Sequence, residues 1–239
     1  MQITTKAIVL SAIKYGDTSL IVKAYTASDG LKTYLIKGVL TSRKGKLKAA
    51  YFLPLMQLEI VAVHKNKGTM ESLREVKVDI PYKTLHTHVV KNSIVLFLSE
   101  MLGNSIREQE QNQGLFNYLQ YAFHWLDENH PDPNFHLLFL LNLTKYLGFY
   151  PDTSGESAPY FDLLEGSFIT TPSLNPLLDG ETVMSFKKLL GMNFDALTTI
   201  KINKTNRQEL LKKVVLYFEL HLHGFRKPKS LAVLNAVFE

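Results

Sequence analysis

The chain contains no cysteine among its 239 residues. Without thiols it forms no disulfide bond, holds no zinc through thiolates and has no cysteine nucleophile. This composition fits a reducing compartment.

Long hydrophobic runs are also missing. The longest apolar stretch after the first residues, 135–143, contains His136 and Asn142 and falls far short of the roughly 20 residues that a spanning helix needs. At the N-terminus, Lys6 is followed only by the short apolar run 7–10, which lacks the features of a secretion signal. We therefore expect a soluble, cytoplasmic protein with no membrane partner.

Signals of catalysis and metal binding are weak. The chain has no Gly-x-Ser-x-Gly elbow. Residues 38–46 differ from a nucleotide-binding P-loop, because six residues rather than four separate Gly38 from Gly45, and Leu47 replaces the Ser or Thr that would hold magnesium. Histidines 86 and 88, like 221 and 223, are two residues apart, so on a helix they point about 200° apart. We expect no enzyme activity, no cofactor and no metal.

Positive charge is concentrated near the N-terminus. Residues 1–80 hold 13 Lys and Arg against 6 Asp and Glu, a balance of +7, whereas the remaining residues hold 14 against 16, a balance of −2. The densest cationic segment, 41–48, lies between two strand-like runs, so its cations would project on a loop from a rigid sheet. Phosphate backbones are the commonest target of such a surface.

The periodicity of apolar residues divides the chain into two parts. Short runs rich in Val, Ile, Leu, Thr and Tyr predict strands at residues 3–13, 18–27, 31–39, 51–63 and 69–78. Between two of them, Asp29-Gly30 indicates a hairpin turn, since glycine reaches the positive φ that a tight turn requires. Five strands without an intervening helix favour a small barrel or a strongly curled sheet.

After Pro81 the period becomes helical. Helices are predicted at residues 84–106, 115–126, 135–147, 181–190, 206–222 and 230–238. Prolines and glycines interrupt residues 151–180, which indicates a looped insertion. The predicted architecture is α+β with two domains, an all-β domain at 1–80 and an all-α domain at 81–239.

The N-terminal part combines the two ingredients of a single-strand nucleic-acid site, which are cations for phosphates and aromatic rings for bases. By strand alternation, Lys32 shares a face with Tyr34, and Lys23 shares one with Tyr25. The candidate nucleic-acid-binding residues are Lys14, Tyr15, Lys23, Lys32, Tyr34, Lys37, Arg43, Lys44, Lys46 and Lys48. The alternative, a solvated lysine face over tyrosines that belong partly to the core, stays open for each single residue.

Several short motifs, in this order, resemble the RecO family of bacterial recombination mediators. They are Lys6-Ala7-Ile8-Val9-Leu10, Tyr15-Gly16-Asp17-Thr18-Ser19-Leu20-Ile21-Val22, Gly30-Leu31 with Lys37-Gly38-Val39, Tyr146-Leu147-Gly148-Phe149-Tyr150-Pro151 and Gly224-Phe225-Arg226-Lys227-Pro228-Lys229-Ser230-Leu231. The resemblance spans the chain from end to end. It implies an OB-fold domain followed by a helical domain.

The same resemblance implies a function. It implies binding of single- and double-stranded DNA, annealing of complementary strands, and cooperation with RecR in loading RecA onto DNA coated by single-strand binding protein, in the cytoplasm and associated with the nucleoid. Many members of the family bind zinc through four cysteines in the insertion. This chain has none, so no metal is expected, and packing and hydrogen bonds must hold residues 151–180.

The resemblance further suggests a protein partner for the helical part, the acidic tail of single-strand binding protein, which ends in Phe. Candidate cations for the carboxylate of that tail are Lys145, Arg207, Lys212 and Lys213. Three alternatives stay open at this point: an RNA-binding OB-fold protein of translation or ribosome assembly, a nuclease or other hydrolase, and a pure adaptor.

Overall fold

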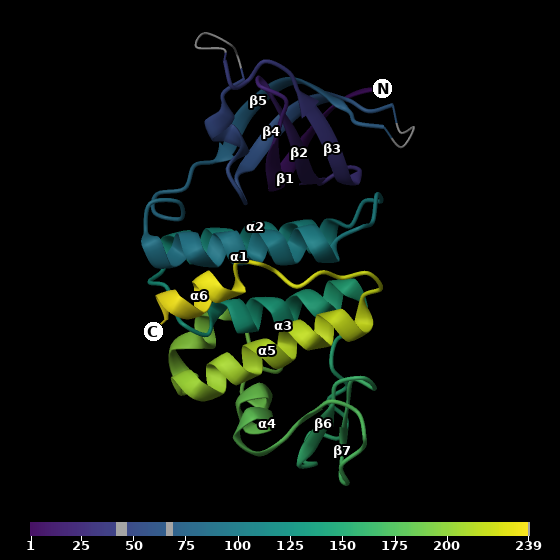
Figure 1. The fold of residues 1–239 in the computed structure, drawn as a ribbon, viewed down its shortest axis with the longest axis vertical. Helices are drawn as coiled ribbons and strands as arrows, with labels where there is room; N and C mark the ends of the chain where they lie inside the picture. The colour runs from purple at the N-terminus through teal and green to yellow at the C-terminus, as the bar shows by residue number, and fades with distance from the viewer. Residues whose placement is uncertain (42–46, 66–68, 239) are drawn as a thin grey trace. The chain divides into compact units, whose positions relative to one another are not determined.

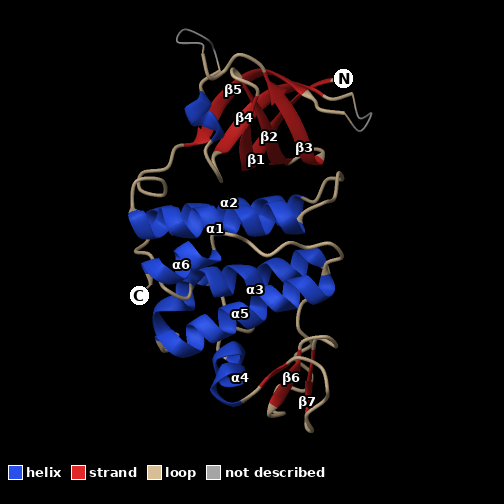
Figure 2. Cartoon of the chain, viewed as in Figure 1, coloured by secondary structure: helices blue, strands red, loops and turns tan. Residues whose placement is uncertain are grey.

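The computed structural model describes residues 1–41, 47–65 and 69–238. They gather into two compact units, Met1–Glu128 and Asn129–Glu239. Strands form most of the first 80 residues and helices most of the rest (Figure 2), so the α+β class is confirmed. These units are defined by contacts between residues and include α1 and α2 in the first unit. The predicted domain boundary after residue 80 stays a prediction.

The first unit begins with a five-stranded antiparallel sheet (Figure 1). Its strands are β1 (Gln2–Tyr15), β2 (Ser19–Thr26), β3 (Gly30–Ile36), β4 (Gln57–Val63) and β5 (Ser72–Ile80), in the order β3-β2-β1-β4-β5. All five predicted strands are present, but the fourth begins later than predicted. Ahead of it lie a 3₁₀ helix, η1 (Ala49–Phe52), and Leu55, whose φ of 61° interrupts extended backbone.

The sheet curls without closing into a complete barrel. Its two edge strands meet at one parallel bridge, between Tyr34 and Glu71, where the Glu71 N–H donates to the Thr33 carbonyl at 2.7 Å and the Leu35 N–H donates to the Glu71 carbonyl at 3.1 Å. A register shift in β1 between Val9 and Ser11 marks a bulge, which bends the strand so that it serves both halves of the sheet. A partly open five-stranded barrel of this kind is an OB fold.

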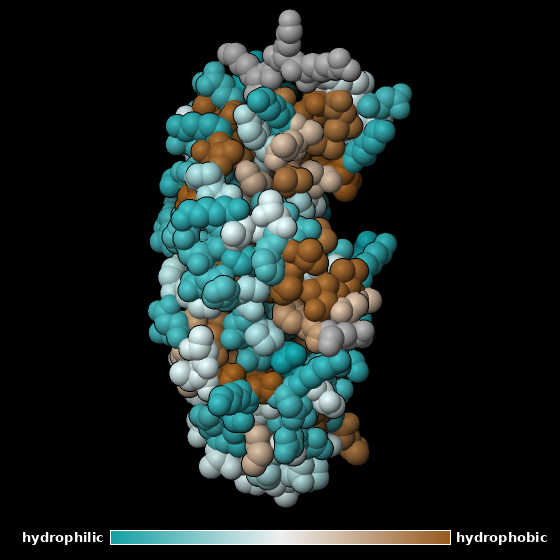
Figure 3. Space-filling view, turned by 90° about the vertical axis from the view of Figure 1, so that its left-hand side faces the viewer, coloured by the Kyte–Doolittle hydropathy of each residue, from teal (hydrophilic) through white to brown (hydrophobic). Residues whose placement is uncertain are grey.

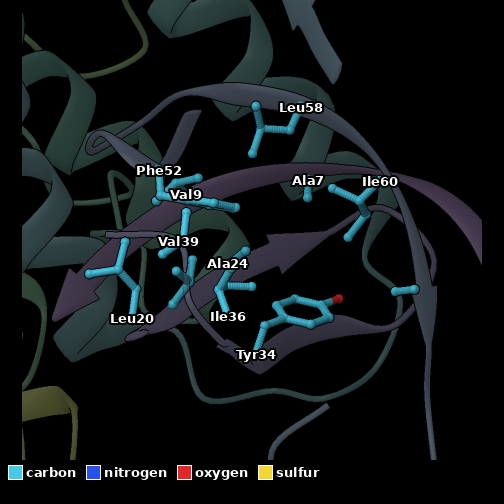
Figure 4. Close-up of a cluster of buried hydrophobic side chains, with 12 residues drawn as sticks. Ala7, Val9, Leu20, Ala24, Tyr34, Ile36, Val39, Phe52, Leu58 and Ile60 are labelled. Atoms are coloured by element: carbon cyan, nitrogen blue, oxygen red, sulfur yellow. The ribbon is translucent and has the colours of Figure 1, made fainter. Parts of the chain in front are cut away.

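Alternate side chains of the strands fill the inside of the curled sheet (Figure 4). The core cluster consists of Ala7, Val9, Leu20, Val22, Ala24, Tyr34, Ile36, Val39, Phe52, Leu58, Ile60 and Ala62. On β3 the burial alternates strictly, with Tyr34 and Ile36 inside. This period of two is what a sheet with one buried face requires.

Two helices pack against the other face of the sheet within the same unit. They are α1 (Val89–Ser105) and α2 (Gln113–Glu128). Tyr25 of β2 stacks on Phe116 of α2, with ring centroids 6.2 Å apart, and the Gln120 side-chain amide donates to Gln57 Oε1 at 3.1 Å. Helix α2 therefore lies against β2 and β4, and α1 contacts β1.

The second unit is mainly helical. Its helices are α3 (Phe135–Leu147), α4 (Gly180–Lys187), η2 (Phe194–Thr199), α5 (Lys204–His221) and α6 (Leu231–Val237). The bounds of α3 agree with the predicted ones, and the helix stops where Gly148 adopts a left-handed φ of 84°. Between α3 and α5, Phe149 stacks on His221 with ring centroids 5.2 Å apart. No helix among residues 1–41, 47–65 and 69–238 is long and apolar enough to cross a membrane.

The insertion is more ordered than a loop. It forms a small sheet in the order β7-β6-β8, from β6 (Tyr160–Asp162), β7 (Ser167–Ile169) and β8 (Leu177–Leu178). Phe161 packs against Phe168, Phe186 and Tyr217, with ring centroids 4.7–5.9 Å apart. The sequence predicted that packing and hydrogen bonds hold this segment but missed the strands, because each is only two or three residues long.

A buried carboxylate organises the same segment. Asp162 is 1% exposed, and its oxygens accept the backbone N–H groups of Leu164 and Glu165 at 2.9 and 3.1 Å. They also accept the Ser173 hydroxyl at 2.6 Å and the Asn175 amide at 3.0 Å. Burial by itself raises the pKa of Asp162, but these donors outweigh it and hold the pKa below its usual value.

Replacing Asp162 with alanine is expected to destabilise the insertion by about 2–3 kcal/mol, because several donors then lose a charged acceptor. Hydrogen exchange of residues 160–178 measures this directly. The matched control is Glu165→Ala, which removes an exposed carboxylate from the turn between β6 and β7 and leaves the Glu165 N–H in place. Equal exchange in both variants would contradict the role given to Asp162.

Candidate nucleic-acid interface

Three predicted residues lie together at one end of the curled sheet. Lys14 pairs across β1 and β2 with Leu20, which pairs across β2 and β3 with Ile36. Because neighbouring strands are about 4.8 Å apart, this row places Lys14 about 10 Å from the residue that precedes Lys37. Lys14 and Lys37 are exposed, and so is Tyr15, at 53%.

The chain just before the basic loop, residues 41–48, is anchored at this same end. The Leu40 N–H donates to the Thr18 carbonyl at 3.0 Å, which ties the segment after β3 to the β1–β2 turn. On the far side of the loop, Lys48 is exposed and precedes η1. Three further candidates, Arg43, Lys44 and Lys46, lie outside the described residues.

Exposed cations on the sheet fall into two groups. Lys6 is paired with Asp79 at 3.0 Å, and Lys77 with Glu59 at 2.8 Å. On or beside the sheet, within the part of the chain that the structure describes, six other exposed cations form no ion pair: Lys14, Lys23, Lys37, Lys48, Lys65 and Arg74. This second group retains its charge for an external anion.

Tyr34 cannot stack a base, and this prediction is wrong. Its ring is fully buried in the core cluster, and its hydroxyl is hydrogen-bonded to His64 Nε2 at 2.8 Å. Burial, reinforced by the charges of Asp29 and Glu71, raises the pKa of the Tyr34 hydroxyl far above its usual value. Lys32 lies on the same interior face and is only 8% exposed, so it is not part of an open phosphate-binding surface either.

The two candidates on β2, Lys23 and Tyr25, differ in exposure. Lys23 is exposed, whereas Tyr25 is fully buried under Phe116, and its hydroxyl lies 3.5 Å from the Asn112 carbonyl. Burial first, and then the charge of Glu108, raises the pKa of Tyr25 to about 12. The two residues share a face as predicted, but α2 covers the half that carries the ring.

Sequence reasoning missed Arg74. In the pairing of β4 with β5, Val61 lies opposite Glu75 and Ala62 opposite Leu73, so Arg74 is the extra residue of a bulge. Bulges re-aim side chains and are frequent beside binding sites. In the sequence, the neighbouring charged residues Arg74 and Glu75 interrupt the alternation of apolar and polar residues, and this interruption could have indicated the bulge.

Apolar side chains accompany these cations. Near the β1–β2 turn Ile13 is 59% exposed, and after β3 Leu40 is 39% exposed. The visible face of the first unit in Figure 3 likewise carries hydrophobic residues side by side with hydrophilic ones. A surface of this mixed kind can bind both the phosphates and the bases of a single strand.

In the second unit the four candidate cations do not form one cluster. Lys145 lies 4.6 Å from the ring centre of Tyr150, and burial lowers its pKa. Phe149, near Lys145, packs on His221, so Lys145 lies toward the C-terminal end of α5. Arg207 precedes His221 by 14 residues, which is about 20 Å along the helix.

The remaining two candidates lie between these positions on α5. Lys212 is exposed and 3.7 Å from Glu209, and Lys213 is half-buried. Arg207 itself is half-buried, with its guanidinium 5.8 Å from the Phe238 ring centre. A carboxylate could therefore meet at most a part of this set.

Metal ligands do not gather in the described residues. Across 1–41, 47–65 and 69–238, no group of three or more His, Asp or Glu is placed to hold an ion. The acidic centre of the insertion, Asp162, is saturated by hydrogen-bond donors of the chain itself.

A curled OB sheet that carries unpaired cations and exposed apolar groups is typical of nucleic-acid-binding proteins. Family models narrow this class: "Recombination protein O N terminal" matches residues 1–81, and "Recombination protein O C terminal" matches residues 86–232. The chain therefore belongs to the RecO family, and the resemblance of its motifs is confirmed.

Curated relatives cover the whole chain. It is 56% identical over 238 residues to the DNA repair protein RecO of Christiangramia forsetii, with 100% of both chains covered. It is 51% and 48% identical, again over 100% of both chains, to the proteins of the same name from Flavobacterium psychrophilum and Flavobacterium johnsoniae. These full-length matches are to members of a family of DNA repair and recombination proteins.

Proposed function

We propose that this protein is a recombination mediator. It binds single- and double-stranded DNA, anneals complementary strands and, with RecR, helps to load RecA onto DNA coated by single-strand binding protein. The observation that carries the proposal is the group of exposed, unpaired cations on the OB sheet of a chain that belongs to the RecO family.

Annealing needs no covalent step. Two DNA strands repel each other through their phosphates, and Lys14, Lys37 and Lys48 would offset part of that repulsion and release bound counterions. Tyr15 offers an exposed ring on which a base can stack. DNA strands that are bound through their phosphates and base faces keep their base-pairing edges free for each other. In this proposal the protein acts by binding and is not an enzyme.

Protein partners would bind to the second unit. The proposed partners are RecR and the acidic tail of single-strand binding protein. Lys212 supports the second proposal best, because it is exposed and its ion pair with Glu209 is long, at 3.7 Å. Lys213 is its neighbour, while Lys145 and Arg207 would act at separate places.

The basic loop provides the test. Changing Arg43, Lys44, Lys46 and Lys48 together to alanine is expected to weaken single-stranded DNA binding about 100-fold near 0.15 M salt. It should also reduce the slope of log K against log salt by about 2.8, because each lost phosphate contact contributes about 0.7. Fluorescence anisotropy of a labelled oligonucleotide over a salt series measures both.

The matched control is Lys6→Ala combined with Lys77→Ala, which removes two cations that are already paired with carboxylates. Its salt slope should equal that of the unchanged protein. An unchanged slope in the loop variant would reject the role of the loop. Failure of the unchanged protein to anneal complementary strands coated by single-strand binding protein would reject the mediator function itself, and preferential binding of RNA of the same sequence would favour the RNA-binding alternative.

A further inference from the structure

We propose that the groove between β3 and β5, where the barrel stays open, holds a segment of single-stranded DNA, with Lys37 and Arg74 on its phosphates. The inference rests on the proposed DNA binding and assigns a path for the strand.

The groove begins where the two edge strands separate. Beyond the Tyr34–Glu71 bridge, no further pairing joins β3 to β5 among the described residues. The space that opens has a volume of about 390 Å³, within the range of about 300–1,000 Å³ that is typical of pockets for small organic ligands. It is lined by Leu35, Ile36, Lys37, Leu47, Ser72, Leu73 and Arg74.

The bulge in β5 explains the position of the cation on this side of the groove. Arg74 is the extra residue between the pairs Ala62–Leu73 and Val61–Glu75. An extra residue bends the strand and leaves itself out of the ladder. Leu73 consequently packs on the core cluster while Arg74 is exposed beside the groove.

The chemistry of the lining fits a polynucleotide. Lys37 directly follows β3 and Arg74 lies on β5, and neither forms an ion pair with another residue in the described part of the chain. Between them, Leu35, Leu47 and Leu73 offer apolar surface for a sugar or a base. Two cations that flank an apolar floor match alternating phosphates and bases, whereas a duplex keeps its bases paired and stacked inside.

The groove also continues the candidate interface. Lys37 follows Ile36, which lies in the same cross-strand row as Lys14. A strand that passes Lys14 and Tyr15 would therefore reach Lys37 next and enter the groove toward Arg74.

A single cysteine tests the path, because the chain has no other thiol. Ser72→Cys places a thiol in the groove, and Ser28→Cys, on the exposed β2–β3 turn, is the matched control. Saturating oligo(dT) is expected to slow maleimide labelling of the thiol at position 72 by about tenfold, since thiol reactivity follows access, and to leave position 28 unchanged.

A second measurement uses charge. Lys37→Ala with Arg74→Ala should weaken oligo(dT) binding about tenfold near 0.15 M salt and reduce the salt slope by about 1.4, whereas Lys77→Ala, on the same strand but paired with Glu59, should change neither. If the unchanged protein binds oligo(dT) while the thiol is unprotected and the slope is unaltered, the groove is not the path, although the proposed function stands. If the unchanged protein binds no DNA, both fall together.

Discussion

Replacing Asp127 with alanine is expected to lower the free energy of unfolding of the first unit by about 3–5 kcal/mol. The carboxylate is 3% exposed and accepts the backbone N–H groups of Lys83, Thr84 and Leu85, each at 2.8 Å. Alanine leaves these three donors without an acceptor at the point where the chain passes from the sheet to α1. Urea unfolding followed by circular dichroism measures the loss.

The neighbouring residue supplies a control of the same charge. Glu128 is paired with exposed Lys83 at 3.0 Å, and an exposed ion pair contributes about 0–1 kcal/mol. Glu128→Ala should therefore unfold almost like the unchanged protein. Equal losses at positions 127 and 128 would show that net charge, and not the hydrogen bonds of Asp127, determines the result.

Acid titration gives an independent reading of the same site. Burial by itself raises the pKa of Asp127, but the three backbone donors and the Thr84 hydroxyl outweigh it and hold the pKa below its usual value. A carboxyl whose pKa is depressed by folding contributes stability above its unfolded pKa and loses it as pH falls through the folded pKa. Asp127→Asn should lack this part of the acid-induced loss of stability.

Much of the fold could be predicted from the period of apolar residues. The five strands and the six helices are all present, because alternate residues on the strands and every third or fourth residue on most helices must face a core. Errors lie at the ends. The fourth strand starts at Gln57 and not at residue 51, since η1 and the positive φ of Leu55 precede it.

The sequence could not determine which face of a strand is inside. On β3, Lys32 and Tyr34 do share a face, but Leu31 and Leu35 make the opposite face equally apolar. Only the curling of the sheet decides that Tyr34 enters the core. Similarly, nothing local to Tyr25 reveals that α2, about 90 residues later, covers its ring.

The sequence also did not predict how β4 and β5 pair or that short strands form in the insertion. Arg74 acquires its position from a two-against-one mismatch with β4, which depends on a strand far away in sequence. Prolines and glycines in residues 151–180 suggested a loop, yet Asp162 and a cluster of aromatic rings stabilise three very short strands there. In each case a long-range contact overrides a local pattern.

Gly30→Ala is expected to destabilise the first unit by about 4 kcal/mol, because it combines a strained backbone with overpacking. The sequence identified Gly30 as a turn residue, and its φ of 61° agrees. The structure adds a close approach: a Cβ at this position would lie 2.4 Å from the Glu110 carbonyl oxygen and 2.7 Å from the Glu108 carbonyl oxygen. These are backbone atoms of the α1–α2 connection, so no side-chain rotation relieves the clash.

Gly16→Ala separates the two contributions. Gly16 has almost the same φ, 58°, but a Cβ there would meet no atom within 4 Å, so only the backbone strain of about 1 kcal/mol is expected. The excess at Gly30 then measures how tightly the β2–β3 turn packs on the helices, where the Leu31 N–H donates to the Glu108 carbonyl at 2.9 Å. Faster hydrogen exchange at Leu31 in Gly30→Ala alone would locate the loss at this contact, whereas equal destabilisation of both variants would mean that the contact contributes nothing.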